Sequence, residues 1–229
     1  MKAAVIRFPG SNCDQDAYFS LRDDMGIEAD YVWHEDTSLS GFDAVIVPGG
    51  FSYGDYLRCG AMASRAPIMA EVARFAREGR PVAGFCNGFQ ILCEAGLLPG
   101  ALMANGLQKF ICRDVHLQAV NKTSLWTTPV DHILRIPIAH GEGRYTVRED
   151  ELKQLEDDGC VAFRYVPGPG ESEEDANPNR SMHAIAGVLN KQGNVLGMMP
   201  HPERATKALF GYGDGRQILK GLLMCGAGR

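Results

Sequence analysis

The amino-acid sequence predicts an α/β fold with a central, mostly parallel sheet, an antiparallel extension of that sheet and a candidate nucleophile on a sharp turn. Short apolar runs alternate with amphipathic segments through the first half of the 229 residues, which indicates parallel strands joined by right-handed crossover helices. The second half holds strand-like runs with few helices between them. The stretch Gly84-Phe85-Cys86-Asn87-Gly88 fits G-x-C-x-G, a pattern that places a nucleophile between a strand and a helix.

The first half contains four predicted strands. Lys2–Phe8 is a continuous apolar run closed by Pro9-Gly10, as in a strand buried on both faces. Further strands are expected at Ala29–Trp33 and Phe42–Val47, and a fourth begins at Val82. In parallel sheets of this kind, functional groups gather at the carboxyl ends of the strands.

Two helices are expected between these strands. Ser11-Asn12 can cap the first, in which Tyr18, Leu21 and Met25 recur at spacings near three and four. The second is predicted over roughly Met62–Arg77, with its apolar residues facing inwards.

The second half predicts an antiparallel or mixed extension of the sheet. Its strand-like runs are Phe110–Val120, Ile133–Ala139, Val161–Val166, Ala184–Leu189 and Val195–Met199, and a last helix is expected over about Gly215–Cys225. The acidic segment 167–181, PGPGESEEDANPNRS, is interpreted as a solvated linker. Because neither an internal repeat nor a domain boundary is evident, residues 1–229 are expected to form one domain.

The composition excludes several classes of partner. A formal net charge of −5 without a long basic run argues against nucleic acid. No apolar run reaches the roughly 18 residues of a membrane span, and the N-terminal apolar run is too short for a signal peptide. Seven cysteines without CxxC spacing indicate reduced thiols in the cytoplasm and no metal site.

Cys86 is the strongest candidate nucleophile. Glycines two positions before and after it permit a turn in which larger side chains would collide. At a helix N-terminus, free N–H groups and the helix dipole stabilise the reactive thiolate. Gln90, four residues later, lies on the same helix face and is expected to contact the substrate. The competing interpretation is an ordinary buried cysteine.

Two other cysteines also lie at predicted turns. Cys13 is flanked by the carboxylates Asp14 and Asp16, which disfavour a thiolate. Cys59 follows Arg58, which favours a thiolate, but it lacks the glycines that precede and follow Cys86.

A thiol nucleophile needs a base, and six histidines are present. His201 follows a buried-looking run and precedes Pro202, which favours extended geometry at His201. In an extended segment Glu203 projects on the same side and can orient the imidazole, which predicts a Cys–His–Glu relay. His140, in AHGEGRY, is the best rival.

An acyl-transfer site also needs N–H donors for an oxyanion. The Asn87 N–H lies directly after the candidate nucleophile. The loop after the third predicted strand, Gly49-Gly50-Phe51, can turn the Gly50 and Phe51 amides towards the site, and Gly49 is expected to lie against the substrate. The competing interpretation of this loop is an ordinary strand-ending turn.

Several longer motifs resemble one enzyme family. They are RFPGSNCDQD, VPGGFSYGDYLRCGA, GFCNGFQIL, AHGEGRY, NPNRS and MMPHPER, which together span most of the chain. The G-x-C-x-G turn around Cys86 and the triplet His201-Pro202-Glu203 resemble the motifs of class I (triad) glutamine amidotransferases. GGFSYGDYLR and PGSNCD resemble, more narrowly, the glutaminase subunits of phosphoribosylformylglycinamidine synthase.

The resemblance implies a class I glutamine amidotransferase-like (flavodoxin-like) fold and a specific reaction. Cys86 would be the nucleophile, with His201 and Glu203 as its partners, and L-glutamine would be hydrolysed to glutamate and ammonia. The ammonia would pass to a synthetase subunit that uses ATP to convert formylglycinamide ribonucleotide to the amidine, in a complex completed by a small third subunit.

The sequence offers no obvious nucleotide site of its own. The phosphate-binding pattern G-x-x-x-x-G-K-[ST] is absent. We therefore expect no cofactor in this chain, and ATP and Mg²⁺ on the synthetase partner. Two other functions stay open. The first is another triad glutaminase or a related cysteine hydrolase on the same fold, and a glutaminase assay would be blank for a hydrolase that is not an amidotransferase. The second is a catalytically silent binding or regulatory subunit, against which the intact Cys86, His201 and Glu203 argue.

Overall fold

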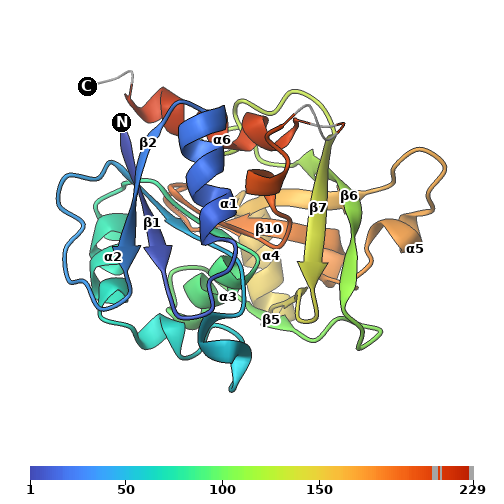
Figure 1. The fold of residues 1–229 in the computed structure, drawn as a ribbon. Coiled ribbons are helices and arrows are strands. Elements are labelled where there is room, and N and C mark those ends of the chain that lie inside the picture. The colour runs from blue at the N-terminus through green and yellow to red at the C-terminus, as the bar shows by residue number, and fades with distance from the viewer. Residues whose placement is uncertain (208–210, 212, 227–229) are drawn as a thin grey trace.

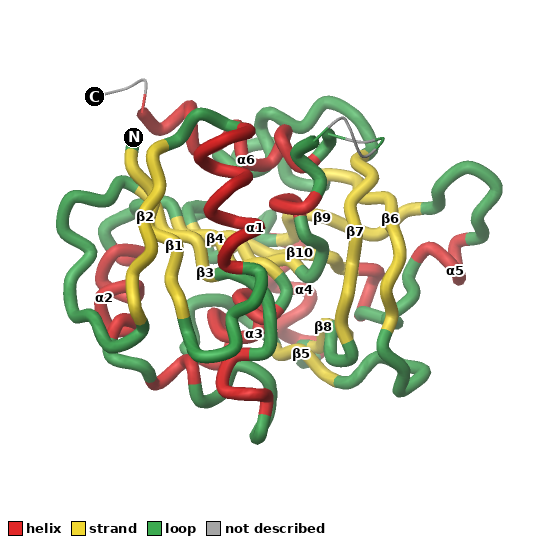
Figure 2. Tube along the Cα trace, in the orientation of Figure 1, coloured by secondary structure: helices red, strands yellow, loops and turns green. Residues whose placement is uncertain are grey.

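The computed structural model describes residues 1–207, 211 and 213–226, and a large sheet runs through its centre (Figures 1 and 2). From one edge to the other, the nine strands are β2 (Glu28–Trp33), β1 (Lys2–Arg7), β3 (Ala44–Val47), β4 (Val82–Phe85), β11 (Val195–Met198), β10 (Ile185–Leu189), β9 (Val161–Val166), β6 (Ile111–Ala119) and β7 (Leu134–His140). Within the described residues, no helix is long and apolar enough to cross a membrane.

The sheet has a parallel half and an antiparallel half. The pairings from β2 through β1, β3 and β4 to β11 are all parallel. Those from β11 through β10, β9 and β6 to β7 are all antiparallel. The predicted parallel sheet with an antiparallel extension is thereby confirmed, and β11 joins the two halves.

Helices cover both faces of the sheet and thereby bury its central strands on both sides. Along β1, Ala4 and Ile6 belong to one hydrophobic core, and Ala3 and Val5 belong to the other. The first core includes side chains of α2 (Ile68–Arg77), α3 (Asn87–Glu94) and α4 (Glu149–Asp157), and the second includes side chains of α1 (Asp14–Phe19) and α6 (Gly215–Gly226).

The helix expected from Met62 begins later than predicted. A 3₁₀ turn covers Ala63–Arg65, and α2 starts at Ile68, after Pro67. Ala66 is extended, with φ −62° and ψ 147°, because the residue before a proline is pushed away from helical geometry.

The predicted cap of the first helix is wrong. Cys13, with no side-chain capping bond, occupies the N-cap position of α1. The Ser11 hydroxyl instead accepts the Phe8 N–H at 3.3 Å and closes the turn after β1. The helix continues beyond Phe19 as a π-helical segment, Ser20–Asp24.

Several short elements beyond residue 100 were not predicted. The strands β5 (Ala101–Met103) and β8 (Arg144–Thr146) pair in a small separate sheet. The helix α4 carries Leu152 and Leu155 on its buried face and acidic residues in its first turn, a signal that the sequence did contain.

Candidate active site

Cys86 lies on a tight turn between β4 and α3. Its φ of 50° and ψ of −109° are rare for a residue with a side chain, and its N–H donates to Met198 O at 2.8 Å. A Cβ on Gly84 would lie 2.5 Å from Gly88 O, and one on Gly88 would lie 1.9 Å from Val47 O. Both glycines are therefore required by close backbone packing, which holds the Cys86 turn in place.

His201 and Glu203 form a buried pair just after β11. His201 Nδ1 lies 2.6 Å from Glu203 Oε1, and each side chain is 1% exposed. The sequence placed them together through an extended segment, whereas the structure does so through a 3₁₀ turn at Pro202–Arg204. The predicted proximity of the two side chains is observed, and the predicted reason for it is wrong.

The environment of His201 favours its charged form. Burial alone would lower the pKa of His201, but the Glu203 carboxylate and the Cys86 sulfur outweigh burial and raise that pKa to about 10. An imidazolium at neutral pH, beside a thiol at a helix N-terminus, is the arrangement that stabilises a thiolate. The Cys86 sulfur also lies 3.7 Å from Ala139 O, a backbone group of β7.

The three expected oxyanion donors differ in availability. Among the described residues, neither the Asn87 N–H nor the Gly50 N–H meets a hydrogen-bond acceptor. The Phe51 N–H, by contrast, donates to Gly10 O at 2.9 Å. In this conformation Phe51 is therefore not free to act as a donor, because the turn after β1 occupies its N–H.

Gly49 and Gln90 both adjoin the candidate nucleophile. A Cβ on Gly49 would lie 2.8 Å from His201 Cε1 and 3.3 Å from Cys86 Cβ, so only glycine leaves room there. The Gln90 side chain donates to Glu142 O at 2.6 Å and accepts from Asn87 Nδ2 at 2.8 Å. It thus ties α3 to the loop after β7, and these two bonds use one N–H and one lone pair of its carboxamide.

The rival thiols have different surroundings. Burial is the main cause that raises the pKa of Cys13, and the Glu203 charge is the second. The nearby Arg204 lowers this pKa and so opposes both. The neighbouring Asp16, which the sequence analysis emphasised, contributes least. Burial and a hydrogen bond to Glu142 likewise raise the pKa of Cys59.

Arg58 does not activate Cys59. Its guanidinium instead forms an ion pair with Glu94 at 2.7 Å.

Part of the segment predicted as a linker supports the site. Asn179 is fully buried and donates to Gly143 O at 2.8 Å and to the Tyr165 hydroxyl at 3.1 Å. Ser172 caps the short helix α5 (Glu173–Ala176) by accepting the Asp175 N–H. The linker interpretation is wrong for this part, because NPNRS packs against the loop that follows β7.

One group of three potential metal ligands occurs in the described part of the chain. The ligand atoms of Cys13, His201 and Glu203 lie within 4.8 Å of one another. However, an Arg204 guanidinium nitrogen lies 3.1 Å from Cys13 Sγ, and His201 and Glu203 are already bonded to each other. The positive charge of Arg204 opposes a cation at this position.

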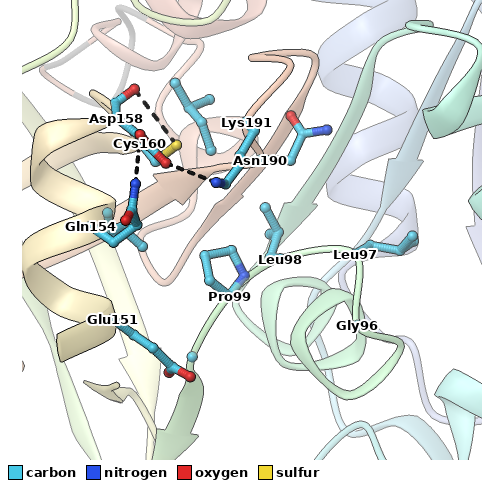
Figure 3. A pocket seen from close by; sticks show the side chains of 13 residues that line it. Gly96, Leu97, Leu98, Pro99, Glu151, Gln154, Asp158, Cys160, Asn190 and Lys191 are labelled. Carbon is cyan, nitrogen blue, oxygen red and sulfur yellow. Dashed lines mark hydrogen bonds and ion pairs between the residues drawn. The ribbon is translucent and has the colours of Figure 1, made fainter. Parts of the chain in front are cut away.

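A separate cavity of about 480 Å³ lies beyond the other end of α3 (Figure 3). It is lined partly by residues 96–100 and by Cys160, and α3 spans about 12 Å between Cys86 and this end. Its Asp158 carboxylate is already paired with Lys191 at 3.1 Å and Gln154 at 2.9 Å. Nothing in this lining resembles the chemistry around Cys86.

The fold is that of a glutamine amidotransferase domain. Residues 1–212 match the family model described as the CobB/CobQ-like glutamine amidotransferase domain. Two curated relatives, from two strains of Thermus thermophilus, are named phosphoribosylformylglycinamidine synthase subunit PurQ. Each is 53% identical over 225 residues, which cover 97% of this chain and 98% of the relative. The chain belongs to the PurQ family of glutamine amidotransferases.

Solved structures agree with this assignment. A chain in the structure of PurLQS from Thermotoga maritima is similar with a TM-score of 0.86 and 45% identity, over 97% of both chains. A glutamine amidotransferase, also from Thermotoga maritima, is similar with a TM-score of 0.56 and 14% identity, covering 99% of this chain and 94% of that one. The second likeness shows the fold alone, and the predicted class I amidotransferase fold is confirmed.

Proposed function

We propose that this chain is the glutaminase of a phosphoribosylformylglycinamidine synthase and that Cys86, His201 and Glu203 carry its chemistry. The observation that carries this proposal is the buried His201–Glu203 pair beside a cysteine on the strained turn at the N-terminus of α3. A packing cysteine would require neither a positive φ nor a charged histidine next to it.

The proposed reaction proceeds through a thioester. The Cys86 sulfur attacks the carboxamide carbon of glutamine, and the Asn87 and Gly50 N–H groups stabilise the oxyanion. His201 donates a proton to the leaving nitrogen, which departs as ammonia, and then accepts a proton from the water that cleaves the thioester to glutamate. Glu203 holds the His201 ring in position and stabilises its positive charge.

The ammonia is used by a partner. In the proposed complex, a synthetase subunit holds ATP and Mg²⁺ and converts formylglycinamide ribonucleotide to formylglycinamidine ribonucleotide, in the cytoplasm and with a small third subunit. The likeness to a chain of the Thermotoga maritima PurLQS structure supports this assembly.

The synthetase partner is proposed to activate the site through the loop after β3. Tyr56 and Leu57, a few residues further along this loop, are 87% and 68% exposed and are available for contact with a partner. Asn87 and Gly50 supply two oxyanion donors, and the third, the Phe51 N–H, is held by Gly10 until contact with a partner rearranges the loop. Losing one such donor costs about a hundred- to a thousandfold in rate.

Two measurements on the complex test the proposal. Cys86→Ala should abolish synthesis from glutamine and leave synthesis from added ammonium salt intact. Equal loss of both would show that Cys86 is structural.

Glutaminase turnover of the chain alone, compared with that of the complex with nucleotide substrate, tests activation. Equal turnover would refute the partner gating and leave the triad untouched.

A further inference from the structure

His140 is a polar residue in an otherwise apolar row. Along β7, the side chains of Leu134, Ile136 and Ile138 are fully buried in the core, and strand alternation places His140 next in that row. Only 3% of His140 is exposed. A histidine buried in this way normally has partners for both ring nitrogens, because an unpaired buried polar atom is costly.

Asn105 determines which His140 nitrogen carries the proton. The Asn105 NH₂ donates to Lys109 O and to His140 O, both at 2.8 Å, which makes its Oδ1 the accepting end. That oxygen accepts the Gly143 N–H at 3.0 Å and lies 3.1 Å from His140 Nδ1. Because an oxygen cannot donate here, Nδ1 carries the proton and Nε2 is left as a lone-pair acceptor.

The Nε2 lone pair of His140 is unused. This atom is buried and, in the part of the chain that the structure describes, has no hydrogen-bond partner. Burial, aided by the charge of His201, lowers the pKa of His140 to about 3, so the ring stays neutral near pH 7.

β7 passes along the reacting end of the site, and the charge of His201 acts on the His140 ring. Ala139, the residue before His140, has its carbonyl oxygen 3.7 Å from the Cys86 sulfur. Pro137 O accepts the His201 N–H at 2.9 Å. The same strand therefore contacts the proposed nucleophile and the proposed acid–base residue through its backbone, and His140 follows directly after these contacts.

We propose that His140 is a substrate-binding residue whose Nε2 accepts a hydrogen bond from the carboxamide N–H of glutamine. This inference rests on the proposed glutaminase function. A neutral acceptor such as Nε2 suits the neutral N–H of the carboxamide, whereas the charged α-ammonium group of glutamine is better matched by a carboxylate. The α-ammonium group also lies at the opposite end of glutamine from the attacked carbon. The contact orients the NH₂ group that leaves as ammonia and favours a primary carboxamide over an ester.

The test compares two substrates that differ at this contact. L-Glutamine has the carboxamide N–H, and L-glutamate γ-methyl ester lacks it. Wild type, His140→Asn and His140→Gln are assayed in the full chain bound to the synthetase subunit. Asparagine keeps a polar group only near Nδ1, whereas the side-chain oxygen of glutamine reaches the position of Nε2.

We expect His140→Asn to lose on the order of tenfold in kcat/KM for glutamine and less than about twofold for the ester. His140→Gln should retain most of the glutamine activity. Equal losses on both substrates, in a variant with an unchanged thermal unfolding midpoint, overturn the inference, as does an unchanged glutamine rate in His140→Asn.

If His140→Asn does not fold, His140→Leu carries the same comparison, because leucine suits the apolar row and offers no acceptor. A wild-type complex that hydrolyses neither substrate would contradict the proposed function itself, an outcome distinct from a failure of His140 alone.

Discussion

Two cysteines occupy equivalent places in this fold and have different surroundings. Cys13 follows β1 and Cys86 follows β4, both parallel strands, and each is the N-cap residue of the next helix. Cys13 has φ −94° and ψ 7°, whereas Cys86 is held at φ 50°. Burial and then the Glu203 carboxylate oppose ionisation of Cys13, whereas Cys86 adjoins the charged His201 ring. Both strand-to-helix turns place a thiol at a helix N-terminus, and the two thiols differ in the charged groups next to them.

The largest expected difference between the two cysteines is in covalent labelling. A glutamine-like diazo-ketone should modify Cys86 at pH 7 and leave Cys13 unmodified, because burial and a neighbouring carboxylate raise the pKa of Cys13. Peptide mapping by mass spectrometry measures this. A label found mainly on Cys13 or Cys59 would reverse the assignment.

Removing the base should have the next largest effect. His201→Ala is expected to lose on the order of a thousandfold or more in glutaminase rate, because both activation of the thiol and proton transfer to the leaving nitrogen depend on it. Steady-state kinetics of the complex measure the loss. A loss of less than about tenfold would mean that another residue is the base.

Glu203→Gln should be less damaging than His201→Ala, on the order of a hundredfold, because an orienting group is removed and the base is retained. This substitution should also lower the pKa of His201 from about 10, because the Glu203 charge that stabilises the imidazolium is lost while burial still favours the neutral ring. NMR titration of the His201 ring measures this pKa. An unchanged pKa, or a rate below that of His201→Ala, would contradict the proposed role of Glu203.

The smallest effect is expected for Cys13→Ala, the matched control for Cys86→Ala. The Cys13 thiol only fills space beside Gly49 and accepts a hydrogen bond from Arg204. We therefore expect the free energy of unfolding to fall by about 1 kcal/mol and the glutaminase rate to fall by less than about threefold. Chemical denaturation and the glutaminase assay measure both. A loss approaching that of Cys86→Ala would mean that the two turns are not chemically distinct.

The sequence predicted what depends on local geometry. The turn at Cys86 is visible because both flanking glycines meet backbone atoms at distances that no side chain permits. Most strand positions followed from apolar runs, because burial on both faces leaves a continuous signal.

Contacts between distant segments were not predictable. Nothing near Phe51 shows that Gly10 accepts its N–H, and nothing near His140 shows that Asn105 fixes its tautomer. Asn179 was taken for part of a linker because its buried partners lie in segments far along the chain. Such residues become interpretable only once strand order is known.

The position of β11 has a consequence for how the enzyme is made. This strand is the last of the sheet to be synthesised, yet it lies between β4 and β10 at the centre. On the ribosome, β4 therefore remains an unpaired edge until residues 195–198 emerge, and such edges invite wrong pairings. His201 and Glu203 follow β11 directly, so the thiol of Cys86 acquires its partners only as the sheet closes. A nascent chain cannot consume glutamine before its sheet is complete.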